Sequence, residues 1–200
     1  MVEWKGRLVS TGIFKEPVEG RIQVDSLNFK GDRQADLSVH GGPDKAIYVY
    51  PAQYYEFWQG EFPKMSLNWG MFGENLTVSG LSDDEVYIGD RFQIGSTELV
   101  VTQPRLPCYK LGVKFGQDDI IRRFLKRGYT GFYLAVLREG KIGKGDKIIS
   151  LSRDEHETKV SDIVTLYISR KADLALMKRA TEVEALPGSW KEYFLQVIRN

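Results

Sequence analysis

Residues 87–95 read YIGDRFQIG, and the pattern returns at residues 142–149 as IGKGDKII. Each segment places a Gly-Asp pair directly before a run of β-prone residues. Glycine adopts the positive φ that a tight turn requires, and an aspartate side chain accepts hydrogen bonds from turn amides. The glycine spacing fits neither the dinucleotide-binding fingerprint nor the phosphate-binding P-loop. We therefore predict that both segments turn corners of a β structure.

Short β-prone runs continue on both sides of these corners. Several alternate apolar and polar residues, which predicts strands with one buried face. Many short strands favour a closed or nearly closed barrel, because closure leaves few unpaired edges. Two helices, at residues 51–60 and 118–127, are expected to interrupt a mainly β fold. The predicted strands are residues 7–13, 20–24, 37–40, 46–50, 75–78, 91–94, 98–103, 133–138 and 147–150.

The pattern changes after Leu151. Residues 152–159 form a polar, charged linker, and the apolar residues beyond it follow a helical period. Ser161 is expected to cap the first of three short helices, and Ser189 with Glu192 resembles a capping box for the third. We predict a β-barrel domain at residues 1–153 and a three-helix domain at 159–200. Three short helices bury little alone, so they should pack on the barrel or on a partner chain, as in a homodimer.

Composition excludes several classes of protein. The 200 residues carry 28 Lys and Arg against 27 Asp and Glu, a balance that argues against a nucleic-acid binder. The single cysteine, Cys108, excludes an intrachain disulfide, a four-cysteine zinc site and a cysteine-ligated iron–sulfur cluster. Neither a secretory signal nor an 18-residue apolar run is apparent, so a cytoplasmic protein without a membrane span is expected.

Cys108 is the main candidate for chemistry. It follows a predicted strand and two prolines, with Arg105 and Lys110 nearby. Prolines stop a sheet ladder, and positive charge favours the thiolate, which is a nucleophile and a metal ligand. The competing interpretation is a small buried hydrophobic residue.

Three glycine-containing loops are candidate ligand contacts, although each could also be an ordinary turn. In residues 40–45, paired glycines and two basic side chains could hold an anion. In residues 73–76, a carboxylate and an amide could bind the polar edge of a heterocycle. Residues 30–34 form a charged loop that could contact the ligand. The candidate residues are Lys30, Asp32, Gln34, His40, Gly41, Gly42, Lys45, Gly73, Glu74, Asn75, Arg105 and Cys108.

In this order, the segments resemble the MOSC domain, named for the carboxy-terminal region of molybdenum-cofactor sulfurase. The helical carboxy terminus further resembles the YiiM-type subgroup, which is associated with resistance to hydroxylaminopurine. The resemblance covers nearly the whole chain. The motifs that carry it are Lys30-Gly31-Asp32 with Gln34, the run Asp36-Leu37-Ser38-Val39-His40-Gly41-Gly42, Phe72-Gly73-Glu74-Asn75-Leu76, and Pro104-Arg105 followed by Pro107-Cys108.

The resemblance implies a β-barrel that binds a molybdopterin-type molybdenum cofactor, with Cys108 as the protein ligand of the metal. It also implies reduction of N-hydroxylated compounds, such as N-hydroxylaminopurines. Because no flavin, nicotinamide or iron–sulfur motif is present, an external reductase, expected to be a flavoprotein, would supply the electrons.

Three other interpretations remain open. The chain could carry or hand over the cofactor without turnover. It could be a metal-free thiol enzyme in which His40 acts as base for Cys108. It could also be a scaffold that binds some other anion.

Overall fold

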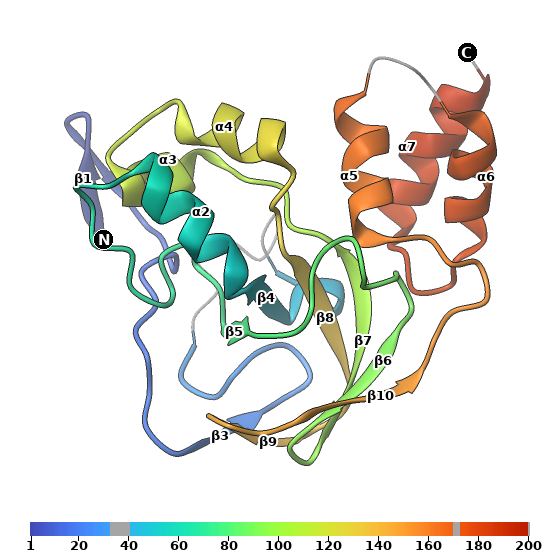
Figure 1. Ribbon diagram of the computed structural model, residues 1–200, viewed down its shortest axis with the longest axis horizontal. Coiled ribbons are helices and arrows are strands. Elements are labelled where there is room, and N and C mark those ends of the chain that lie inside the picture. The colour runs from blue at the N-terminus through green and yellow to red at the C-terminus, as the bar shows by residue number, and fades with distance from the viewer. Residues whose placement is uncertain (33–40, 170–172, 200) are drawn as a thin grey trace.

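A six-stranded mixed sheet organises the protein (Figure 1) in the computed structural model, which describes residues 1–32, 41–169 and 173–199. Strands β4 and β5 run parallel, and the other neighbouring strands run antiparallel. In spatial order the strands are β10 (Ile148–Ser152), β6 (Arg91–Ile94), β7 (Thr97–Pro104), β8 (Phe132–Arg138), β4 (Ile47–Pro51) and β5 (Leu76–Val78). Two separate ribbons pair β1 (Val2–Trp4) with β2 (Arg7–Val9), and β3 (Arg21–Val24) with β9 (Gly140–Gly143).

The mainly β character is confirmed in outline, but the closed barrel is not. Within the described ranges no ladder joins the outer strands β10 and β5, so the sheet forms a half-barrel. The strand predicted at residues 7–13 ends at Val9, and the one at 37–40 lies outside the described residues. Strands β1 and β9 were not predicted, because three or four residues beside glycines show no clear alternation.

Both Gly-Asp corners form as expected. Gly89 has φ +91° and Gly145 has φ +87°. The carboxylate of Asp90 accepts a hydrogen bond from the amide of Tyr87 at 3.1 Å, and that of Asp146 accepts one from Gly143 at 2.9 Å. These bonds close the turns that lead into β6 and β10.

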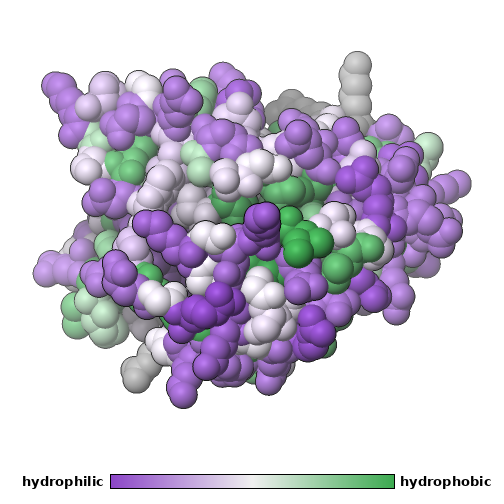
Figure 2. Space-filling model, turned by 60° about the horizontal axis from the view of Figure 1, so that its bottom comes forward, coloured by the Kyte–Doolittle hydropathy of each residue, from purple (hydrophilic) through white to green (hydrophobic). Residues whose placement is uncertain are grey.

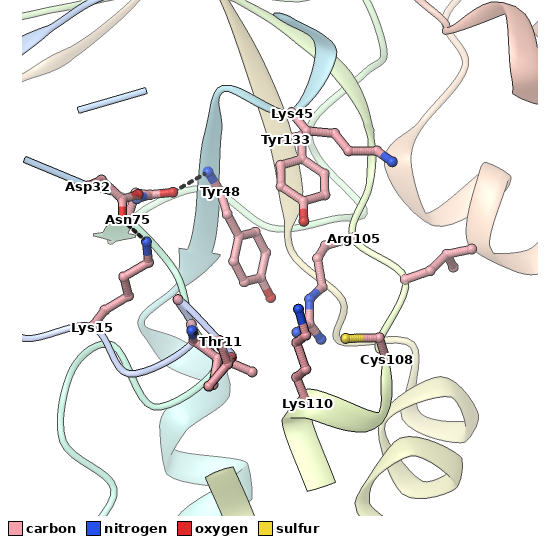
Figure 3. A pocket seen from close by; sticks show the side chains of 14 residues that line it. Thr11, Lys15, Asp32, Lys45, Tyr48, Asn75, Arg105, Cys108, Lys110 and Tyr133 are labelled. Atoms are coloured by element: carbon pink, nitrogen blue, oxygen red, sulfur yellow. Dashed lines mark hydrogen bonds and ion pairs between the residues drawn. The ribbon is translucent and has the colours of Figure 1, made fainter. Parts of the chain in front are cut away.

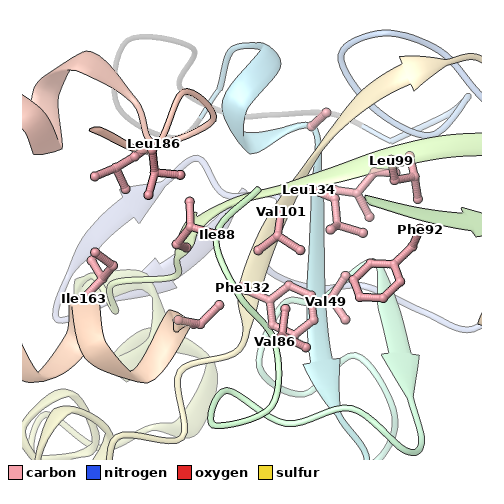
Figure 4. Close-up of a cluster of buried hydrophobic side chains, with 14 of the residues drawn as sticks. Val49, Val86, Ile88, Phe92, Leu99, Val101, Phe132, Leu134, Ile163 and Leu186 are labelled. Atoms are coloured by element: carbon pink, nitrogen blue, oxygen red, sulfur yellow. The ribbon is translucent and has the colours of Figure 1, made fainter. Parts of the chain in front are cut away.

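Alternation along β4 separates two apolar cores. Ile47 and Val49 point into the larger core, which Figure 4 shows spreading across β6, β7 and β8. Tyr48 and Tyr50 point to the opposite side, into an aromatic core under three helices. There Tyr50 stacks on Phe72 with ring centroids 4.2 Å apart. The helices are α2 (Gln53–Glu61), α3 (Tyr109–Phe115) and α4 (Ile120–Arg127).

The carboxy-terminal helices pack on the sheet of their own chain (Figure 1). The indole Nε1 of Trp190 donates to Gln103 Oε1 on β7 at 3.0 Å. The helices are α5 (Val160–Ile168), α6 (Leu174–Glu182) and α7 (Gly188–Arg199). Because α7 already begins at Gly188, Ser189 lies inside the helix and the expected capping box is wrong. The division into domains at 1–153 and 159–200 stays a prediction.

The face shown in Figure 2 is largely hydrophilic, with apolar side chains gathered near its middle. Large apolar side chains that remain exposed include Leu137 on β8 and Ile149 and Leu151 on β10. Across the described ranges, no helix has the length and apolar composition that crossing a bilayer would require.

Asp83 is a buried carboxylate that ties the helices to the sheet. Its Oδ2 accepts hydrogen bonds from the amides of Thr130 at 2.9 Å and Gly131 at 3.0 Å. Its backbone carbonyl accepts one from Ser161 in the first turn of α5. Burial raises the pKa of Asp83 to about 7, although the bonds from Thr130 and Gly131 oppose this rise.

This raised pKa predicts a stability that falls with increasing pH. The folded state holds the proton up to about pH 7, whereas the unfolded chain releases it near pH 4. The free energy of unfolding should therefore fall by up to about 4 kcal/mol between pH 4 and 8. We expect Asp83→Asn to remove this part of the slope in denaturant titrations, while Asp84→Asn, at an exposed neighbour, keeps it. If the free energy of unfolding depended equally on pH in wild type, Asp83→Asn and Asp84→Asn, the assignment of this pH dependence to Asp83 would be contradicted.

Candidate functional site

A cavity lies where the segment between β2 and β3 meets β4, β8 and the connection from β7 to α3 (Figure 3). One end is occupied by Lys15, Asp32 and Asn75, and the other by Arg105, Cys108 and Lys110. Tyr48 and Tyr133 stand between them. These two tyrosines are paired across β4 and β8, which places their rings on the same face, 5.4 Å apart. The register between β4 and β8 thus brings these two tyrosines together in the middle of the cavity.

Cys108 lies just past the end of β7, as predicted. Its extended backbone, with φ −122° and ψ 172°, makes it the residue directly before α3. The thiol is half-buried on the cavity wall, and Figure 3 shows its sulfur directed toward Arg105. A core cysteine would instead be enclosed by apolar side chains. The helix α3 itself was not predicted, because it contains a glycine and has no side-chain cap.

Arg105 places an almost fully buried guanidinium at the cavity, with 6% of its surface exposed. Its charge lies 5.3 Å from the centre of the Tyr48 ring. Burial by itself would lower the pKa of Arg105, but the acidic groups of Tyr48, Tyr133 and Cys108 raise it above its usual value. Its Nη1 has no hydrogen-bond partner in the part of the chain that is described. A buried donor of this kind is suited to an anionic ligand.

Two lysines add positive charge to the wall. Lys110 is only 9% exposed. Lys45 is half-buried, and burial lowers its pKa, although the charge of Asp44 opposes this. Lys45 is held in place because its short 3-10 helix, η1 (Pro43–Lys45), is fastened to β7 by a bond from Thr102 Oγ1 to the carbonyl of Asp44 at 2.7 Å.

A polar network closes the opposite end. Asp32 forms an ion pair with Lys15, and its Oδ2 accepts a hydrogen bond from Asn75 Nδ2 at 2.7 Å. Asn75 Oδ1 accepts one from the amide of Tyr48 at 2.9 Å, which fixes this end to the edge of β4. These bonds therefore tie Asp32, in the loop after β3, and Asn75, directly before β5, to the backbone of β4.

Half of the residues predicted from the sequence meet at this cavity. Asp32, Lys45, Gly73, Asn75, Arg105 and Cys108 line it. Lys30, Gly41, Gly42 and Glu74 are described, but they are not on its wall. Gln34 and His40 lie outside the described residues.

Glu74 organises the chain rather than facing a ligand. It is 3% exposed, and its carboxylate accepts bonds from the amides of Gly70 at 2.8 Å and Phe72 at 3.1 Å. The hydroxyls of Tyr55 and Thr77 also donate to it. The sequence predicted that Glu74 and Asn75 would both contact a ligand. Of these two neighbours, only Asn75 lines the cavity.

Five residues that were not predicted as site residues also line the cavity: Thr11, Lys15, Tyr48, Lys110 and Tyr133. Lys110 was predicted only as a positive charge near Cys108. Predicting that α3 begins directly after Cys108 would have placed Lys110 in the first turn of that helix, beside the cavity. The tyrosines appear in the sequence as ordinary strand residues, and only the β4–β8 register brings them together.

The donor set fits a molybdenum cofactor. Cys108 supplies a soft sulfur ligand, and Arg105, Lys45 and Lys110 supply charge for anionic groups. The volume of the cavity, about 100 Å³, is below the 300–1,000 Å³ typical of pockets that enclose a drug-sized ligand. Residues beyond the enclosed space must therefore also contact a ligand as large as molybdopterin.

The proximity of Arg105 to Cys108 is testable without any cofactor. A nearby buried cation favours the thiolate, so Arg105→Gln should slow alkylation of Cys108 by iodoacetamide several-fold near pH 7. The matched control is Arg122→Gln, on the exposed surface of α4, which should leave the rate unchanged. Equal alkylation rates in wild type and Arg105→Gln would contradict the electrostatic coupling.

Comparison with known proteins gives one family. A profile of the MOSC domain matches residues 36–149. The YiiM crystal structure from Geobacillus stearothermophilus superposes with a TM-score of 0.83 at 32% sequence identity, over 98% of this chain and 93% of that chain.

Three curated relatives are similar in sequence. The uncharacterized protein YflK of Bacillus subtilis is 41% identical over 195 residues, covering 98% of this chain and 88% of YflK. YiiM of Escherichia coli is 38% identical over 145 residues, covering 72% of this chain and 65% of YiiM. A protein named reductase from Gibberella moniliformis is 31% identical over 181 residues, covering 89% of this chain but only 32% of that protein.

Proposed function

Because the chain belongs to the MOSC domain family, we propose that it binds a molybdopterin-type molybdenum cofactor at the cavity and reduces N-hydroxylated compounds such as N-hydroxylaminopurines. The observation that carries this proposal is the pairing of the half-buried Cys108 thiol with the buried, partly unsatisfied guanidinium of Arg105 on one wall. The relative named reductase supports the direction of the chemistry.

Each side chain on the wall has a task in this proposal. Cys108 would hold the metal as a thiolate. Arg105 offsets negative charge beside it and keeps the thiol ionised. Lys45 would bind an anionic group of the cofactor, and the Asp32–Asn75 pair would meet polar atoms of its heterocycle.

The reaction consumes two electrons and two protons: the N–OH bond breaks, an N–H bond forms, and water leaves. The bound molybdenum cofactor would supply the two-electron chemistry at oxygen. The protein must supply a proton for the departing hydroxyl. Lys110 is suited to this task, because an ammonium group can release a proton whereas a guanidinium does not.

The proposed reaction needs an electron donor. The chain has one cysteine and no nucleotide-binding glycine fingerprint, so we propose a separate reductase, a flavoprotein, as donor in the cytoplasm.

The proposal is tested by turnover with a chemical reductant. Protein purified from a host that makes the cofactor should convert N-hydroxyadenine to adenine when dithionite-reduced methyl viologen supplies electrons. Conversion should depend on the protein and stop in Lys110→Met, with Lys64→Met as an exposed control. Protein that contains full cofactor but produces no adenine would contradict the reductase. Transfer of that cofactor to an apo-enzyme would then favour a carrier.

A further inference from the structure

A second hollow adjoins the cavity, between the β1–β2 hairpin and the start of α3. Its volume is about 770 Å³, within the range of small-molecule sites. Trp4, Lys5 and Arg7 of the hairpin line it, and so do Tyr109 and Lys110 of α3. Lys110 also lines the cavity, so the two hollows share one wall, but Cys108 and Arg105 do not line the second.

The hairpin presents an aromatic ring beside a guanidinium. Lys5 and Gly6 both have positive φ, as a two-residue hairpin turn requires. The register then pairs Trp4 directly with Arg7, which places both side chains on one face. Lys5 bonds to Asp118 at 2.5 Å and so anchors the hairpin tip beside α4.

The start of α3 adds a second aromatic side chain to this groove. Tyr109 is 56% exposed, so much of its side chain is open to a ligand. No carboxylate lines this groove within the described ranges, whereas three cations do. Lys5 is engaged by Asp118 and Lys110 also lines the cavity, so Arg7 is the cation that this groove offers to an anion. Aromatic side chains stack on planar bases, and arginine binds phosphate with two parallel hydrogen bonds.

We propose that this groove binds a nucleotide, with its base against Trp4 and Tyr109 and its phosphate at Arg7. The nucleotide could be a free molecule or a nucleotide joined to the cofactor in the adjoining cavity, because both carry the same base and phosphate. The site does not depend on the metal, so it can be measured on protein free of cofactor.

Calorimetric titration of the cofactor-free protein with AMP and with adenine tests the site. AMP should bind about tenfold more tightly than adenine, as expected for one charge-assisted phosphate contact. Arg7→Gln should remove this advantage and leave adenine affinity unchanged. Trp4→Ala should weaken both ligands about tenfold, and Trp4→Phe, which keeps a ring and guards against misfolding, only a few-fold. Trp69→Ala and Arg91→Gln are controls, since both residues lie outside the groove.

Equal affinities for AMP in wild type, Trp4→Ala and Arg7→Gln, or no binding of millimolar AMP, would overturn the site. Protein loaded with cofactor distinguishes the two sources. If it still binds AMP, the nucleotide is a free molecule. If binding is lost and the released cofactor contains a nucleotide, the groove holds the nucleotide of the cofactor. If binding is lost and the released cofactor has none, the groove belongs to molybdopterin itself and the proposal falls.

Discussion

Replacing Cys108 with alanine is expected to lower the reduction of N-hydroxylated substrates by at least about a thousandfold, because the cofactor loses its protein ligand. The fold should tolerate the change, since the thiol is half-buried on a cavity wall and not packed in a core. The melting temperature should stay within about 2 °C of wild type. Turnover with the chemical reductant and thermal unfolding measure the two effects.

Ser66→Ala is the matched control for this substitution. Ser66 is exposed and lines neither the cavity nor the second groove, so the variant should retain turnover within a few-fold. Wild-type turnover by Cys108→Ala would show that the sulfur has no part in the reaction.

The second large effect is expected for Gly131→Ala, which should destabilise the fold by more than about 3 kcal/mol. Gly131 has φ +64°, and a Cβ there would lie 2.3 Å from the carbonyl oxygen of Val49 on β4. Neither backbone can move freely, because Val49 is paired with Phe132 across β4 and β8, and the carbonyl of Gly131 accepts a hydrogen bond from the amide of Arg105. The substitution should therefore also displace Arg105 and lower activity.

Gly128→Ala measures the cost of backbone strain alone, without the steric clash expected in Gly131→Ala. Gly128 has φ +77°, but a Cβ there meets nothing within 4 Å. This variant should lose only about 1 kcal/mol, the strain of a left-handed backbone. Denaturant titration of both variants gives the comparison. Equal losses in the two variants would show that close approach to β4 does not restrict residue 131.

The strands could be predicted where the sequence alternates over several residues. The runs at 91–94 and 133–138 match β6 and β8 within one residue. Alternation does not reveal which strands meet, so barrel closure could not be derived from it. Within the described residues, β5 and β10 each pair with one neighbouring strand and no ladder joins them.

A site residue could be predicted from the sequence where its immediate neighbours are unusual for a buried residue of its type. Cys108 stands out because prolines and a guanidinium surround it, whereas the segment around Asn75 resembles an ordinary turn and was selected chiefly through the family resemblance. Tyr48 and Tyr133 carry no such mark, since buried tyrosines are common in strands and their pairing depends on register. Glu74 was misplaced because the sequence does not show which of two adjacent polar side chains turns inward.

The central claim is that Cys108 holds a molybdenum cofactor at this cavity. Its most direct test is the molybdenum and pterin content of wild type and Cys108→Ala, both purified from a host that makes the cofactor. We expect about one molybdenum and one pterin per wild-type chain and a loss of most of the metal in the variant. Equal metal content in the two proteins, or no molybdenum in freshly isolated wild type, would contradict the claim.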